Sequence, residues 1–156
     1  MTSYNAIPYE SLPISYTYVP FLAALGRLYG LETPDPSACR VLELGCAEGS
    51  NIVPMAYYFP NSEFVGIDLS EVQIASGQAH IDALELSNIT LYVDDLAQMR
   101  ASDYGKFDYI IVHGVFSWVP PAVQQRILQL GKALLTEQGM MYISYNTYPG
   151  WHQHMV

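Results

Sequence analysis

The sequence is poor in charge and in cysteine, and it contains no long apolar run. Charged residues make up 13% of the 156 positions, well below the quarter or so that is typical of a globular domain. Two cysteines are too few for a disulfide scaffold, so we expect reduced thiols and a cytoplasmic protein. No apolar run reaches the roughly 18 residues that cross a bilayer, and no basic start precedes an apolar core at the amino terminus, so we expect no membrane association.

Basic residues are the scarcest charged class. Six Lys and Arg stand against fifteen Asp and Glu, which gives a formal charge of −9. A protein that binds nucleic acid through its phosphates needs the opposite balance, so we expect no nucleic-acid partner and a basic or neutral substrate. The low overall charge also indicates surface that is covered, either in a homo-oligomer or by the carboxy-terminal part of a longer protein.

A metal motif is absent as well. Cys39 and Cys46 flank the first predicted strand without the spacing of metal ligands. His152 and His154 have no third partner at a recognisable spacing. We therefore assign no metal.

What the sequence does contain is an apolar strand, a glycine-bearing loop and a helix in succession. Val41 to Leu44 is a short apolar run closed by Gly45, and helical spacing begins near Asn51. Such a loop leaves the first amides of the helix facing a crevice at the carboxyl edge of a parallel sheet, where nucleotide-like cofactors bind. The alternative is that Gly45 and Gly49 serve only the steric needs of a tight turn.

The spacing of the glycines bears on which cofactor the loop would take. A dinucleotide fingerprint has three glycines, and counting from Gly45 the other two positions hold Ala47 and Ser50. NAD is therefore disfavoured.

A second strand is predicted over Glu63 to Leu69, with Asp68 near its end. In nucleotide-binding βαβ units, an acid about 20 residues after the glycines accepts hydrogen bonds from ribose hydroxyls. The alternative role of Asp68 is to cap the next helix, but Ser70 is better placed for that. Asp68 is thus a second candidate cofactor residue, with Leu69 beside it.

Three further strands are predicted over Asn88 to Asp94, Phe107 to His113 and Met140 to Tyr145, and helical spacing separates them. This alternation predicts an α/β protein with a doubly wound parallel sheet and right-handed crossovers. The pair Asp94 and Asp95 closes the third strand, and turn capping explains it as well as ligand binding does.

Glu43, Gly45 and Gly49 form the pattern acid-x-Gly-x-x-x-Gly, which resembles the glycine-rich motif of class I S-adenosylmethionine-dependent methyltransferases. The resemblance implies S-adenosylmethionine as cofactor and a Rossmann-like sheet of five predominantly parallel strands in the order 3-2-1-4-5. It implies that the loop faces the methionine half of the cofactor, the second strand the ribose, and the ends of the third and fourth strands the adenine. The implied cofactor-binding residues are Glu43, Gly45, Cys46, Gly49, Asp68, Leu69, Asp94, Asp95, Leu96 and His113.

A narrower resemblance is carried by residues 4–11, 40–51, 54–56 and 145–151. They are similar to the amino-terminal half of bacterial methyltransferases that carry a methyltransferase regulatory domain. Members of that group are considerably longer, and some methylate lysines in proteins. Class I methyltransferases add a sixth strand and an antiparallel seventh, whereas the given sequence stops at Val156, just after the fifth, so we expect a sheet without that final hairpin. The narrower resemblance implies a carboxy-terminal regulatory domain as a partner in the full-length protein.

The length fits one domain, which we divide into an amino-terminal arm and helix, residues 1–30, and a methyltransferase core, residues 31–156. The helix is expected over Phe21 to Gly30, packed on the sheet. Since the substrate surface of the resembling group draws on parts beyond Val156, we expect this chain alone to methylate poorly.

The sequence offers Tyr9, His113 and Tyr148 as candidate catalytic residues and does not select one of them. His113 is the only histidine at a predicted strand tip and is a candidate general base, although a histidine bonded within a loop is commoner. Tyr9, Tyr148 and Trp151 would supply an aromatic, partly dry surface for a lysine side chain, or would simply pack.

The expected function is methyl transfer from S-adenosylmethionine to a nucleophile in a protein or a small molecule, with a protein lysine as the favoured acceptor. Two alternatives remain: a non-catalytic module that binds cofactor or a partner, and an NAD-type oxidoreductase. Uptake of S-adenosylmethionine or of NAD separates the last from the others.

Overall fold

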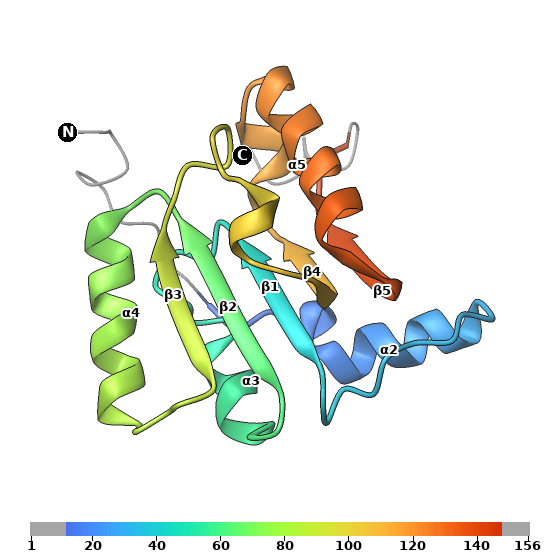
Figure 1. The fold of residues 1–156 in the computed structure, drawn as a ribbon, viewed down its shortest axis with the longest axis horizontal. Helices are drawn as coiled ribbons and strands as arrows, with labels where there is room; N and C mark the ends of the chain where they lie inside the picture. The colour runs from blue at the N-terminus through green and yellow to red at the C-terminus, as the bar shows by residue number, and fades with distance from the viewer. Residues whose placement is uncertain (1–11, 148–156) are drawn as a thin grey trace, which may run out of the picture.

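A computed structural model of the chain describes residues 12–147. Its centre is one sheet of five strands in the order β3-β2-β1-β4-β5, and all four pairings are parallel (Figure 1). The predicted fold class and strand order are confirmed. The strands are β1 (Arg40–Leu44), β2 (Glu63–Asp68), β3 (Ile89–Val93), β4 (Phe107–Val112) and β5 (Leu135–Ile143).

Helices cover both faces of the sheet, and the buried positions of the central strands β1, β2 and β4 are apolar except for Glu43 on β1. One core contains buried side chains of α2 (Val19–Leu28), α3 (Val53–Tyr58) and α4 (Glu71–Ala83). The opposite core contains those of α5 (Pro121–Leu134). Residues 12–147 also contain three short 3-10 helices, η1 (Ser15–Thr17), η2 (Ala101–Asp103) and η3 (Phe116–Trp118).

Helix ends follow the predicted signals. Ser70 caps α4, where its hydroxyl accepts a hydrogen bond from the Gln73 N–H. Gly30 lies just past the end of α2 with φ of +81°, and the Leu31 N–H donates to the Gly26 carbonyl. Helix α2 was expected over Phe21 to Gly30, and it begins and ends two residues earlier, at Val19 and Leu28.

Strand five departs from its predicted bounds. It was expected over Met140 to Tyr145, but α5 runs directly into β5 at Leu135 and the strand ends at Ile143. The register with β4 is irregular over the first half of β5, and a Cβ at Gly139 would lie 3.0 Å from the Phe107 carbonyl oxygen. The turn usually found between helix and strand is thus replaced by a bulged strand that needs glycine.

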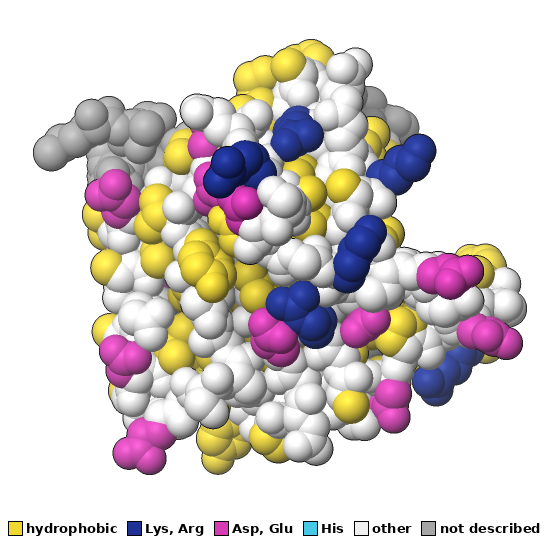
Figure 2. Space-filling view, in the orientation of Figure 1, with side chains coloured by type: hydrophobic (Ala, Val, Ile, Leu, Met, Phe, Trp, Pro, Cys, Tyr) yellow, Lys and Arg dark blue, Asp and Glu magenta, His cyan; other side chains and the backbone are white. Residues whose placement is uncertain are grey.

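Acidic side chains are spread over the visible face of the molecule, whereas over α4 that face shows no Lys or Arg (Figure 2).

None of the helices described between residues 12 and 147 combines the length and the apolar character needed to cross a membrane.

β5 is an edge strand in the described part of the chain, because it pairs only with β4. Met140 to Ile143 carries neither charge nor proline, so its outer backbone groups are unprotected. We predict that the chain self-associates through this edge.

Light scattering at micromolar concentration tests this prediction. The Ser144 N–H donates to Val112 on β4, so by alternation the Ile143 N–H points away from the sheet. Ile143→Pro should weaken association roughly tenfold, the worth of about one hydrogen bond, while Ile143→Val should not. A monomeric parent would refute the prediction.

Candidate functional site

The loop after β1 turns back over the sheet through three left-handed residues. Gly45, Ala47 and Gly49 have φ of 76°, 52° and 78°. The N–H groups of Gly45 and Cys46 both donate to the Ile67 carbonyl on β2, at 2.7 and 3.1 Å. Because an alanine at positive φ is strained, the surrounding contacts must hold this loop in shape.

Gly45 is also required for space, since a Cβ there would lie 2.3 Å from Val115 in the loop after β4. The side chain of Cys46 points into the core beside Gly66, and burial raises the pKa of its thiol well above the ordinary value. Cys46 is therefore a neutral packing group, and only its backbone is available to a ligand.

Asp68 joins the loop to the end of β2. Its carboxylate accepts the Ala47 N–H at 2.8 Å and the Ser70 N–H at 2.9 Å, one on each oxygen. Each oxygen can accept a second hydrogen bond, and the side chain is only half-buried. The ribose role of Asp68 stays a prediction, as does that of the neighbouring Leu69, which is exposed at the strand tip.

Glu43, near the end of β1, is buried and only half satisfied. Its exposed fraction is 4%, and Oε1 accepts a hydrogen bond from Asn51 Nδ2 at 2.7 Å. Its second oxygen, Oε2, has no hydrogen-bond partner among residues 12–147. Burial raises the pKa of Glu43 to about 8, with a smaller contribution from the Asp68 charge, while the Asn51 hydrogen bond opposes the shift. A cationic donor beside Oε2 would satisfy this group.

Asn51 is a residue of the site that the sequence analysis missed. Its Oδ1 accepts from the Ile14 N–H at 2.9 Å and from the Thr17 hydroxyl at 3.1 Å, while its amide donates to Glu43. One buried amide thus ties η1, the loop and Glu43 together. The signal available in the sequence was an amide side chain at the end of a glycine loop.

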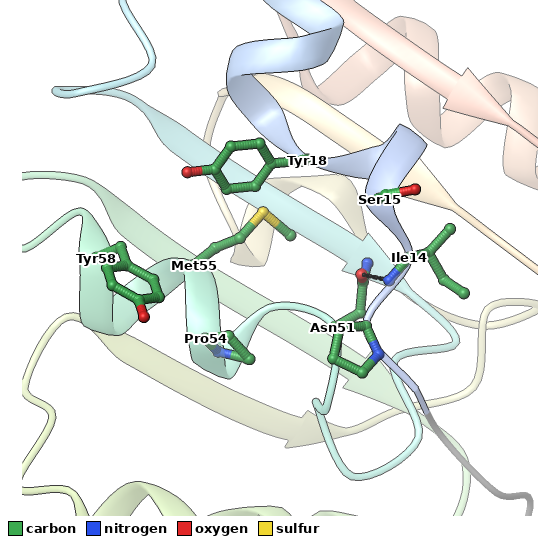
Figure 3. A pocket seen from close by; sticks show the side chains of 8 residues that line it. Ile14, Ser15, Tyr18, Asn51, Pro54, Met55 and Tyr58 are labelled. Atoms are coloured by element: carbon green, nitrogen blue, oxygen red, sulfur yellow. Dashed lines mark hydrogen bonds between the residues drawn. The ribbon is translucent and has the colours of Figure 1, made fainter.

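A hollow of about 370 Å³ lies beside this junction, between η1 and α3 (Figure 3). Figure 3 shows Asn51 next to Ile14, with the hydrogen bond between them drawn. None of the predicted cofactor residues lines the hollow, so it is not the predicted site. Its lining residues are Pro13, Ile14, Ser15, Tyr18, Asn51, Pro54, Met55 and Tyr58.

The far side of the loop rests on α4. The Glu48 carboxylate accepts hydrogen bonds from the hydroxyls of Ser50 and Ser76, at 2.9 and 3.1 Å. A Cβ at Gly77 would lie 2.3 Å from the Glu48 carbonyl oxygen, so glycine is what lets the helix approach. The loop is therefore held between α4 and η1.

The carboxylates after β3 cap turns in the structure. Asp94 accepts hydrogen bonds from the Tyr104 hydroxyl at 2.6 Å and from the Asp95 N–H. Asp95 accepts from the Ala97 N–H at 2.9 Å and from the Gln98 side chain. Leu96 is half-buried against the α5 core. Asp94 and Asp95 thus cap turns, which was the alternative role given for them. The predicted contact with adenine remains a prediction.

His113 follows β4 directly. Since Glu43 on β1 is in register with Ile111, His113 lies level with Gly45, beside the loop. Its ring contacts those of Tyr16 and Tyr142, and burial lowers its pKa. Its Nδ1 is buried and has no hydrogen-bond partner among the described residues. His113 is therefore a neutral ring among aromatic side chains at neutral pH.

Tyr9 and Tyr148, the other catalytic candidates, lie outside the described residues, as does Trp151. Within residues 12–147, no three His, Cys, Asp or Glu side chains gather to hold a metal ion.

Comparison with known proteins gives several matches. The model of the methyltransferase domain family matches residues 35–154. An uncharacterised protein of Rickettsia prowazekii (strain Madrid E) is 44% identical over 149 residues, which are 96% of this chain and 27% of that protein. A second uncharacterised protein of the same strain is 41% identical over 150 residues, or 96% of this chain and 60% of that one.

Among solved structures, PKMT2 from Rickettsia typhi in complex with AdoHcy superposes with a TM-score of 0.88 at 41% identity. The match covers 93% of this chain and 28% of that one. The chain therefore spans 27% to 60% of the length of these three relatives.

The buried Glu43 generates a prediction for stability. The native state keeps the Glu43 proton up to about pH 8, whereas the ordinary value is 4.5. The native state therefore binds more protons than the unfolded chain between these values, and the free energy of unfolding falls as the pH rises, by up to about 1.4 kcal/mol per unit. Glu43→Gln should abolish this fall.

Urea unfolding at about pH 5.5 and 7.5 checks it, with an expected difference between parent and variant of roughly 2 to 3 kcal/mol. Glu63→Gln is the matched control. The Arg40 guanidinium holds the pKa of Glu63 below its usual value, so Glu63 titrates below this window. If the free energy of unfolding changes equally with pH in the parent and in Glu43→Gln, burial does not disfavour the ionised form of Glu43.

Proposed function

The chain belongs to the methyltransferase domain family, with S-adenosylmethionine as its methyl donor, and we propose that it methylates the side-chain amine of a protein lysine. The proposal of the acceptor rests on three points: the similarity to longer bacterial methyltransferases, the acidic charge of −9, and the aromatic surroundings of His113. An acidic protein attracts a basic acceptor.

The observation that carries the cofactor part of this proposal is Oε2 of Glu43, which has no partner among residues 12–147 and lies beside a loop of left-handed residues. A buried carboxyl oxygen without a donor is costly, and the amino group of a bound amino-acid moiety is the donor it lacks. Gly45 and Gly49 adopt positive φ, so the loop can turn tightly at the strand end beside Glu43. The residues present therefore fit the cofactor.

We assign the amino-acid half of the cofactor to Glu43 and the loop from Gly45 to Gly49, and the ribose to Asp68. We assign the adenine to Asp94, Asp95 and Leu96, and we place His113 beside the loop, near the methyl end of the cofactor. S-adenosylmethionine supplies a methyl group activated on a sulfonium, which departs as a neutral thioether. The protein has to hold the acceptor amine in line, exclude water and keep the amine unprotonated.

Asp68→Ala should lower the affinity for S-adenosylhomocysteine by about tenfold or more, because a charge-assisted hydrogen bond pair is worth roughly 1.5 to 3 kcal/mol. Isothermal titration calorimetry measures the change. Ser70→Ala is the matched control: it removes the cap of α4, at a cost of about 1 kcal/mol in stability, but leaves the ribose contact. Unchanged affinity in Asp68→Ala would remove Asp68 from the site.

Methyl transfer itself is tested by incubating residues 1–156 with S-adenosylmethionine and a lysine-rich protein, followed by mass spectrometry of its peptides. We expect slow methylation of lysines, since the chain spans only part of the length of its relatives. Binding of S-adenosylhomocysteine without transfer to any lysine would favour the non-catalytic module. Binding of NADH in its place would favour the oxidoreductase, against which the family assignment argues.

A further inference from the structure

Three aromatic rings from distant segments meet at the carboxyl edge of the sheet. Tyr16 belongs to η1, His113 follows β4 and Tyr142 lies near the end of β5. The ring centroids of Tyr16 and His113 are 5.7 Å apart, those of Tyr16 and Tyr142 6.2 Å, and those of His113 and Tyr142 6.3 Å. Tyr16 is 48% exposed and the other two are half-buried, so the cluster forms a surface that solvent reaches.

This aromatic surface lies next to the loop assigned to the cofactor. Ile111 on β4 is in register with Glu43 on β1 and with Tyr142 on β5. Side chains two residues apart on a strand share a face, so His113 lies on the face of Ile111, one step nearer the strand tip. Ile111 and Tyr142 both belong to the core on the α2 side, which η1 borders.

The position of Tyr16 depends on the same hydrogen-bond junction as Glu43. Ile14 and Thr17, on either side of Tyr16, both donate to Asn51, and Asn51 donates to Glu43. Thr17 is fully buried. The ring is therefore presented by an anchored turn and is fixed relative to the loop.

The chemistry of the surface favours a cation. Aromatic faces attract ammonium groups, and the neutral ring of His113 does not repel them. Nδ1 of His113 is buried, so only Nε2 of this ring can contact a ligand.

A carboxylate acceptor, by contrast, finds no counter-ion here. All six basic side chains lie in the described residues, and none is in η1 or in the loops that follow β1, β4 and β5. Four of them are engaged elsewhere, with carboxylates or backbone carbonyls. The six are Arg27, Arg40, Arg100, Lys106, Arg126 and Lys132.

We infer that Tyr16, His113 and Tyr142 form the acceptor site, an aromatic surface that binds the alkylammonium side chain of a lysine and discriminates against carboxylate acceptors. The inference rests on the proposed function and names the residues that select its substrate. Tyr16 and Tyr142 position the side chain through their ring faces, and Nε2 of His113 faces the amine.

The test is a nuclear magnetic resonance titration of residues 1–156 saturated with S-adenosylhomocysteine. The ring signal of His113, identified with His113→Gln, is followed as Nα-acetyl-lysine amide is added. The matched probes are Nα-acetyl-norleucine amide, which lacks the charge, and Nα-acetyl-glutamate amide, which reverses it. The lysine probe should bind about 3- to 30-fold more tightly than the norleucine probe, and the glutamate probe should leave the signal unmoved.

Three variants separate binding from folding. Tyr16→Ala should abolish the preference for lysine, whereas Tyr16→Phe should retain it because the ring is kept. Tyr29→Ala removes an 80% exposed tyrosine at the end of α2 and should change nothing. The affinity for S-adenosylhomocysteine, measured by calorimetry, should stay within about twofold of the parent in all three.

Each outcome decides the inference. A shift of the His113 signal that is equal for lysine and norleucine, or larger for glutamate, would overturn it while the proposed function stands. So would a lysine preference that survives Tyr16→Ala. Failure of the parent chain to bind S-adenosylhomocysteine at all would overturn the proposed function and this inference together.

Discussion

A carboxyl group with a single partner, buried at the centre of a parallel sheet, sets the arrangement of everything around it. Within the described part of the chain Asn51 is the one hydrogen-bond partner of the Glu43 carboxyl, and Asn51 in turn fixes η1, the turn that precedes α2. Removing such a group from water is costly, and the fold limits that cost by keeping Glu43 protonated, since burial raises its pKa to about 8, and by the hydrogen bond from Asn51. The positions of η1 and of the glycine loop are therefore coupled to the protonation of Glu43.

Much of the fold was predictable from the sequence, because buried parallel strands are mostly apolar, Glu43 apart, and the glycines mark where they end. The strand order came from the resemblance to methyltransferases. The bounds of β5 were wrong, since a helix that passes straight into a strand leaves no turn residues to read. Asn51, Tyr16 and Tyr142 were missed for another reason: their contacts join distant segments, which no local pattern encodes.

The acidic residues at the strand ends show why a ligand role and a structural role are hard to separate from sequence. Asp68 and Asp94 each hold backbone amides, yet a carboxylate has more acceptor positions than these bonds use. The same side chain can shape an empty loop and receive a hydroxyl group. Such residues link the stability of the protein to the occupancy of its site.

The central position of β1 has a consequence for how the protein assembles. β1 pairs with β2, which follows it closely, and with β4, which comes only after α4 and β3. Closing the longer segment costs more chain entropy, so we expect it to come later. The loop is bonded to β2 through Ile67 and Asp68, and we expect it to form in the early part of folding. We expect the ring of His113 to reach the loop later, so that a chain interrupted during synthesis would have one side of its site and not the other.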